Sequence, residues 1–178
     1  KSKNEYQYLE NELNKNINLN YANENPKTIF FDYGGANVAK ALHVGHLRSA
    51  NIGEALKRLA NAMGYKTIAD THLGDWGRPI GLVMTEIKHR MPELPYFDEN
   101  YSGDYPTESP VSNDDLMEIY PLASTKAKED EEYMEEARVI TSKFQQGDKG
   151  LMALWNHIMD VSKADIKRVY DRLNVTIS

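Results

Sequence analysis

Apolar residues fall into two short runs of strand character, with helical spacing between and after them. The first run covers residues 28–33, Thr-Ile-Phe-Phe-Asp-Tyr, and the second covers 66–70, Lys-Thr-Ile-Ala-Asp. Both are rich in β-branched or aromatic residues, so each predicts a strand. Between them an apolar face repeats every three or four residues and predicts a helix, at Ile52, Leu56, Leu59, Ala60 and Met63. A strand, a helix and a strand in this order predict two parallel strands.

Helical spacing continues after the second strand. Gly64 is placed to end the first helix as its C′ residue. Asp75 is a plausible N-cap for a second helix. That helix runs to about residue 91 on an apolar stripe formed by Ile80, Val83, Met84, Ile87 and Met91. Pro92 is expected to end it.

The following stretch predicts a surface loop and then more helices. Residues 96–112 hold tyrosines, glycine and prolines, which are typical of a long loop. Ser112 or Asn113 is expected to cap the next helix. Pro121 is expected to interrupt it, with a second helical segment over 122–145. A last helix covers about 149–172.

These elements indicate an α/β fold, built from parallel strands with crossover helices and a helical insertion. Residues 1–27 are expected to form an arm or linker, and 28–92 a βαβ nucleotide-binding core. A loop over 93–112, a helical region over 113–173 and the start of another strand at 174–178 follow. Parallel sheets normally have both faces covered, so we expect both faces of this sheet to be buried. Two or three strands do not complete such a sheet, which suggests a fragment of a longer protein.

Composition narrows the possible functions. The 178 residues suffice for one domain with a sizeable core. The absence of cysteine excludes disulfides, cysteine zinc sites and a cysteine nucleophile, and it fits a reducing cytosol. The net charge of −6 means that any RNA contact is local or lies outside this chain. No run of about 18 apolar residues is present, so we expect no membrane span.

The strongest candidate site lies where the first strand leads into the first helix. His43 and His46 are three residues apart at the helix start, so their rings share one side of the first turn. A metal pair and a hydrolase base are both possible, but no obvious third ligand and no nucleophile motif accompany them. A phosphate site uses everything present: two imidazole donors, a helix N-terminus and Gly45, which lets a planar base approach the backbone. We therefore favour a nucleotide phosphate.

Other candidate residues are expected near the same end of the first strand. Asn37 and Lys40 lie on the loop outside the carboxyl end of the first strand, where open α/β sheets bind ligands. Gly35, His72, Asp75 and Trp76 are possible pocket-wall residues. Trp76 would wall the pocket or pack under the following helix, and packing is the expectation we favour.

Three segments then resemble one known family. Ala36-Asn-Val-Ala-Lys-Ala-Leu-His-Val-Gly-His46 resembles the HIGH-motif region of arginyl-tRNA synthetases, in which Asn-[Ile/Val]-Ala-Lys precedes the histidines. Leu73-Gly-Asp-Trp-Gly77 resembles the Gly-Asp-Trp-Gly segment of that family. Residues 119–155 are similar to connective helices of bacterial members. The histidine motif alone would indicate only a class I synthetase or a related nucleotidyl transferase.

The resemblance implies a partial Rossmann-like class I synthetase catalytic domain in a cytoplasmic, usually monomeric enzyme. Its implied activity is ATP-dependent activation of L-arginine, with Mg²⁺ accompanying ATP, and transfer to tRNA(Arg). By motif, His43 and His46 would be catalytic and contact ATP together with Gly45. Asn37 and Lys40 would hold the α-amino and carboxylate end of arginine.

The chain also departs from the family pattern. Gly34-Gly35-Ala36 replaces a serine-containing pair followed by proline, and Pro79 stands where many members have a glutamine. A Lys-Met-Ser-Lys-type loop, the acidic guanidinium pocket and the anticodon-binding domain are expected beyond Ser178, so this chain alone should not aminoacylate. The alternatives are another nucleotidyl transferase, a class I synthetase of different specificity, or a non-enzymatic nucleotide-binding module.

Overall fold

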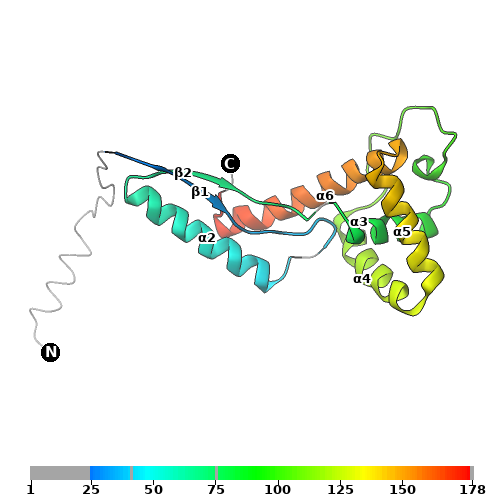
Figure 1. The fold of residues 1–178 in the computed structure, drawn as a ribbon, viewed down its shortest axis with the longest axis horizontal. Coiled ribbons are helices and arrows are strands. Elements are labelled where there is room, and N and C mark those ends of the chain that lie inside the picture. Colours follow the sequence, from blue (N-terminus) through cyan, green and yellow to red (C-terminus); the bar gives the residue numbers. More distant parts are fainter. Residues whose placement is uncertain (1–24, 41, 75, 177–178) are drawn as a thin grey trace, which may run out of the picture.

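The computed structural model of the protein describes residues 25–40, 42–74 and 76–176. An α/β part contains strand β1 (Thr28–Asp32), helix α2 (Val44–Ala62) and strand β2 (Lys66–Asp70). A helical part contains α3 (Arg78–Arg90), the short 3₁₀ helix η1 (Pro95–Phe97), α4 (Asn113–Glu129), α5 (Glu131–Gln145) and the start of α6 (Lys149–Leu173). Figure 1 shows α6 running from the helical part back to α2 and the sheet. Among these elements, no helix combines the length and apolar character needed to cross a membrane.

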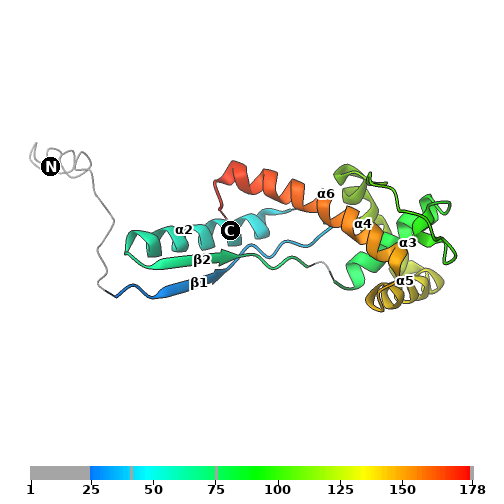
Figure 2. The ribbon, with the colours of Figure 1, turned by 90° about the horizontal axis from the view of Figure 1, so that it is seen from above.

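The two strands pair in parallel, as predicted. Phe30 lies opposite Ile68, and Phe31 lies opposite Ala69. The Phe31 and Ala69 side of the sheet is covered, because Ala69 joins a buried cluster with Tyr33, Ala36, Ala50, Ile166, Tyr170 and Val175. This cluster takes residues from the α/β part and from the C-terminal half of α6. Figure 2 shows the same arrangement from above, with α2 lying alongside both strands.

The other side of the sheet is open among the described residues, which corrects the prediction that both faces are buried. Phe30 and Ile68 form a cross-strand pair on that side and are 59% and 51% exposed. Neither α2 nor α6 covers this side, because both pack on the Ala69 side. The parallel pairing of the strands is therefore as predicted, whereas the burial of both faces of the sheet is not.

Helix α2 forms as predicted and ends at Gly64, but it turns a different face inward. Four of the five apolar residues on its predicted face are exposed, at Ile52, Leu56, Leu59 and Met63, and the fifth, Ala60, is buried. Its buried face consists of the small residues Ala50, Gly53 and Ala60 together with Glu54 and Lys57. A Cβ atom on Gly53 would lie 2.2 Å from Cγ of Tyr33, so glycine allows the helix to approach this ring. Close approach to Tyr33 therefore decides which face of α2 is buried.

The helical part has the larger apolar core. Helix α3 runs through its centre and buries every residue from Ile80 to Ile87. Phe144 of α5 and Leu154 and Ile158 of α6 are fully buried in the same cluster. Hydrophobic burial on this scale is the main force that holds such a bundle together.

One buried carboxylate ties α3 to its neighbours. Glu86 is 2% exposed and accepts hydrogen bonds from Lys126 Nζ at 2.9 Å, Tyr133 Oη at 2.8 Å and Arg90 Nε at 3.2 Å. Burial alone would raise the pKa of Glu86, but these hydrogen bonds lower it below its usual value. The group is therefore a satisfied buried charge that links α3, α4 and α5.

The prediction that Pro121 interrupts a helix is wrong. Helix α4 continues through it, and the break lies at Asp130 instead. The buried residues of α4 lie on both sides of Pro121, so packing outweighs the loss of one backbone hydrogen bond. Asp130 ends α4 and caps α5, since its carboxylate accepts the Glu132 and Tyr133 N–H groups.

The remaining helix boundaries agree closely with the sequence. Ser112, one of the two expected residues, caps α4, and it also forms a reciprocal pair with Asp115 that was not predicted. The N-cap of α3 is Gly77, and the predicted cap Asp75 lies outside the described residues. The predicted loop over 96–112 begins within η1, and Tyr96 of this short helix is buried.

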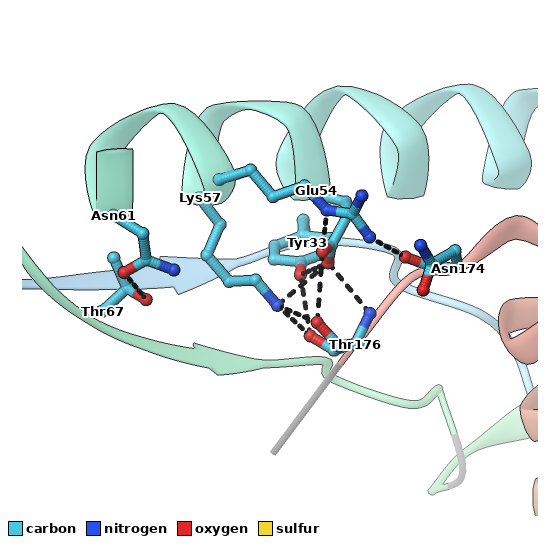
Figure 3. Close-up of polar contacts among 8 residues, drawn as sticks. Tyr33, Glu54, Lys57, Asn61, Thr67, Asn174 and Thr176 are labelled. Atoms are coloured by element: carbon cyan, nitrogen blue, oxygen red, sulfur yellow. Dashed lines mark hydrogen bonds and ion pairs between the residues drawn. The ribbon is translucent and has the colours of Figure 1, made fainter. Parts of the chain in front are cut away.

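A second buried carboxylate, Glu54 of α2, joins the two ends of the α/β part (Figure 3). It accepts hydrogen bonds from Tyr33 Oη at 2.8 Å and Arg58 Nε at 2.8 Å. Lys57 Nζ lies 2.9 Å from the carboxylate, and the Thr176 N–H donates to it at 2.9 Å. Burial would raise the pKa of Glu54, but these donors together lower it to about 2. Glu54 thereby fixes the segment after α6 against α2 and the end of β1.

That segment was expected to begin a strand. Asn174 ends α6 in the left-handed conformation, with φ of 54°. Val175 and Thr176 are not assigned to a strand, and residues 177–178 lie outside the described part. Arg58 nevertheless donates to the Asn174 carbonyl, so side chains of α2 hold this segment along its length.

We expect Glu54→Gln to destabilise the chain by about 2–4 kcal/mol, because the change leaves buried donors without their charged acceptor. The pKa of Glu54 is lowered from 4.5 to about 2, so its stabilisation is complete above pH 4.5 and is lost as pH falls toward 2. Urea unfolding at several pH values would measure both effects. Glu135→Gln, at an exposed i,i+3 pair with Arg138, is the control and should change stability by less than about 0.5 kcal/mol. Equal effects of the two variants would contradict the prediction.

The two apolar faces should differ in their contribution to stability. Leu154→Ala, in the core, should cost about 2–5 kcal/mol of unfolding free energy. Leu59→Ala removes the same atoms from an exposed position and should cost less than about 0.5 kcal/mol in the 178-residue chain. Thermal and urea unfolding of the two variants would show the contrast. A large cost at Leu59 would mean that this face is covered in solution.

Candidate nucleotide-binding site

His43 and His46 form the N-terminal cap of α2. His43 is the N-cap residue, and its Nδ1 accepts the Gly45 N–H at 3.1 Å. The His43 N–H in turn donates to Nδ1 of His46 at 3.3 Å. The ring centroids are 3.9 Å apart, so the two imidazoles lie together, as the spacing predicts. Both rings use Nδ1 as an acceptor, which places the proton of each neutral ring on Nε2.

The electrostatics of this turn suit an anion. The N-terminus of a helix carries a partial positive charge from its aligned peptide dipoles. Burial, followed by electrostatic interaction with the neighbouring His43 and Lys40, lowers the pKa of His46. His46 therefore stays neutral at physiological pH and offers an Nε2–H donor at the positive end of α2.

A hollow lies beside this turn, between the end of β1 and the first turns of α2. Its volume is ≈ 440 Å³, and its lining includes Asp32, Gly45, Arg48 and Ser49. A Cβ atom on Gly45 would lie 2.9 Å from Cε1 of His43, so glycine leaves room for this ring beside the helix. The hollow thus combines a cation, a carboxylate, a hydroxyl group and the start of a helix, and the two histidines lie beside it and not in its lining.

The loop after β1 is fixed to the loop after β2. Asn37 forms a parallel bridge with Gly74, in which the Val38 N–H donates to the Gly74 carbonyl at 3.1 Å. The Gly74 N–H donates to the Ala36 carbonyl at 2.9 Å. A Cβ atom on Gly74 would lie 2.2 Å from Oδ1 of Asn37, so the amide side chain lies directly over this glycine. The bridge holds Asn37 where the strands end.

Lys40 lies next to the helical part. Its side chain is exposed, and Nζ lies 5.7 Å from the centroid of the Tyr120 ring, which is on α4. The preceding residue, Ala39, is buried and donates its N–H to Oγ of Ser162 on α6 at 3.0 Å. The loop that carries Lys40 therefore touches two helices of the helical part.

The four expected pocket-wall residues do not all meet at one place. The Gly35 N–H donates to Oγ1 of Thr71 at 3.2 Å, and Nδ1 of His72 lies 3.2 Å from Oδ2 of Asp32. Both contacts are at the mouth formed by the strand ends. Trp76 instead packs against Phe144 and Trp155 of the helical part, with ring centroids 4.4 Å and 5.9 Å away. Asp75 lies outside the described residues.

Sequence reasoning did not identify the residues that support this loop from a distance. Tyr120 and Ser162 contact it from 80 and 123 positions away, and no local pattern marks them. Ser162 could have been noticed as a hydroxyl on the apolar side of a helix. The described residues hold no group of three or more His, Cys, Asp or Glu side chains that could bind a metal ion.

Comparison with known proteins gives the family. The family model described as "tRNA synthetases class I (R), catalytic domain" matches residues 8–178. The chain is 57% identical over 150 residues to an arginine–tRNA ligase of Alkaliphilus oremlandii (strain OhILAs), which covers 84% of the chain. It is 55% identical over 150 residues to the arginine–tRNA ligase of Agathobacter rectalis, also over 84% of the chain. The chain spans only 26% and 25% of these two relatives.

A solved structure gives the same result at the level of the fold. The crystal structure of arginyl-tRNA synthetase from Plasmodium falciparum matches with a TM-score of 0.62 and 27% identity. The match covers 91% of this chain and 25% of that chain. The strand, glycine loop and capped helix described above thus lie within a class I catalytic domain, and the chain belongs to the arginine (R) family of class I tRNA synthetases.

Proposed function

We propose that this chain provides one wall of the active site of an arginine–tRNA ligase. The enzyme would activate L-arginine with ATP and transfer it to tRNA(Arg). The chain spans about a quarter of its curated relatives, so the activity is assigned to the full-length product of the gene that encodes it. The capped start of α2 carries the proposal, because two histidines, a helix N-terminus and a hollow lie together inside a family catalytic domain.

The first step joins arginine to the α-phosphate of ATP. An oxygen of the arginine carboxylate attacks the α-phosphorus, the bond to the bridging oxygen breaks, and pyrophosphate leaves. Negative charge grows on the phosphate oxygens during this exchange. Nε2–H donors on His43 and His46 and the positive end of the α2 dipole would stabilise that charge. No covalent bond to the protein is needed, so the residues act by position and charge.

Binding of the two substrates would use neighbouring surfaces. The adenosine would bind beside the start of α2, in the hollow that Gly45 lines. Lys40 would pair with the carboxylate of arginine, and the Asn37 amide would hydrogen-bond its α-amino end. The bridge from Asn37 to Gly74 supports this placement, because it fixes the amide beside the strand ends.

The metal ion, the tRNA and the cellular location are proposed from membership of the family. Mg²⁺ would arrive with the ATP phosphates, and tRNA(Arg) would receive the arginyl group. The net charge of −6 suits a chain whose main tRNA-binding surface lies elsewhere in the enzyme. We place the enzyme in the cytoplasm with the translation machinery.

The test of the proposal is amino-acid-dependent exchange of pyrophosphate into ATP. We expect the full-length gene product to catalyse exchange with arginine when tRNA(Arg) is present. The other nineteen amino acids serve as controls at the same concentration. Exchange that depends on another amino acid would overturn the assignment to arginine, and no exchange with any of them would overturn the enzyme assignment.

His46→Ala should lower kcat/KM for exchange by about 10²–10³, because it removes a donor aimed at the reacting phosphate. Its melting temperature should fall by only a few degrees, since the ring makes one cap hydrogen bond. His89→Ala is the matched control, because His89 pairs with Glu136 in the helical part. Wild-type exchange in His46→Ala would remove the phosphate role from this residue.

A further inference from the structure

Ala39 has an unusual backbone conformation. Its φ is 57°, and Asn174 is the other non-glycine residue with positive φ among the described residues. L-residues with a Cβ atom rarely adopt this left-handed region, and those that do are held by their surroundings. Asn174 ends a helix, where the conformation is common, but Ala39 does not. Something in the structure must therefore hold Ala39.

The contacts on either side identify what holds it. Val38, just before Ala39, is 1% exposed and is fixed through its N–H to the Gly74 carbonyl. The Ala39 N–H donates to Ser162 Oγ at 3.0 Å, and these two residues are 3% and 5% exposed. A buried N–H group needs a partner, so this hydrogen bond favours the conformation that points the Ala39 N–H at α6. Figure 1 shows the segment after β1 running beside α6.

Ala39 lies between the two residues assigned to arginine. Asn37 is fixed by its bridge to Gly74, and Lys40 follows Ala39 directly. The backbone angles at Ala39 therefore set the direction in which Lys40 leaves the fixed part of the loop. With φ at 57°, Lys40 emerges at the surface with its ammonium group near the Tyr120 ring. An extended residue at position 39 would direct Lys40 elsewhere.

We propose that Ser162 is a positioning residue for arginine binding: its hydroxyl holds the left-handed turn at Ala39 and so presents Lys40 to the arginine carboxylate beside Asn37. The inference rests on the proposed function, and it adds a residue from the helical part to that site. Ser162 touches neither substrate in this scheme. Its effect passes through the backbone of Ala39.

The experiment compares variants of the full-length gene product in tRNA-dependent pyrophosphate exchange. Ser162→Ala removes the acceptor for the Ala39 N–H and should raise KM for arginine about tenfold, the typical effect of losing one buried hydrogen bond. KM for ATP should change by less than about twofold, because the start of α2 is not altered. Ser162→Thr keeps the hydroxyl and should retain an arginine KM within about threefold of wild type. Ser142→Ala, an exposed serine on α5, is the control and should leave both constants unchanged.

A second substitution separates positioning from general loss of structure. Glycine adopts positive φ without a steric cost, so it should keep the turn when the hydrogen bond is absent. In an Ala39→Gly background, Ser162→Ala should therefore raise KM for arginine less than about threefold. A merely structural role for Ser162 predicts no such rescue. It predicts a fall in melting temperature with equal changes in both KM values.

The outcomes distinguish this inference from the proposed function. An unchanged arginine KM in Ser162→Ala, or equal changes for arginine and ATP, would overturn the positioning role and leave the enzyme assignment intact. Absence of arginine-dependent exchange in the wild type would overturn the proposed function and the arginine role of Ser162 with it. Hydrogen exchange at the Ala39 amide tests the contact itself without any substrate. Protection should be strong in the wild type and lost in Ser162→Ala, and equal protection would overturn the contact.

Discussion

The buried carboxylate of Glu54 fixes the chain after α6 against α2 and the end of β1. Its donors come from the end of β1, from α2 and from Thr176, which follows α6. A charge that is nine-tenths buried is tolerated only when its oxygens are satisfied, so these groups must come together. Fixing Thr176 fixes the end of α6, and α6 in turn brings Ser162 to Ala39 and Tyr170 into the cluster under the sheet. The placement of the loop that carries Asn37 and Lys40 thus depends on a contact outside the candidate site.

Local signals predicted most elements, because their causes are local. The strands, the cap at Ser112 and the end of α2 at Gly64 depend on residues within one or two turns. Pro121 misled the prediction, since buried residues before and after it keep α4 continuous. The apolar stripe of α2 misled it for a different reason. Periodicity identifies an apolar face, but it does not say which partner is present, and Tyr33 selects the small face around Gly53.

Some residues of the candidate site could likewise be predicted from the sequence, and others could not. His43, His46, Asn37 and Lys40 lie within ten residues of one another, and a contiguous motif was enough to nominate them. The groups that hold the loop, Tyr120 and Ser162, come from helices far along the chain. A single sequence contains no pairing information over that distance, because neither tyrosine nor serine at those positions is unusual for a helix. The contribution of the helical part to the site therefore required coordinates.

The length of α6 has a mechanical consequence. Lys149, at its start in the helical part, and Ser162, beside Ala39, are separated by about 20 Å along the helix axis, at 1.5 Å per residue. For a rigid rod of this length, a tilt of about three degrees moves one end by about 1 Å relative to the other. A displacement of 1 Å is enough to break a hydrogen bond of 3.0 Å. A tilt of α6 of this size, caused by repacking around η1 or α5, would therefore break the hydrogen bond to Ala39 and alter the backbone beside Lys40, without any substitution in the loop itself.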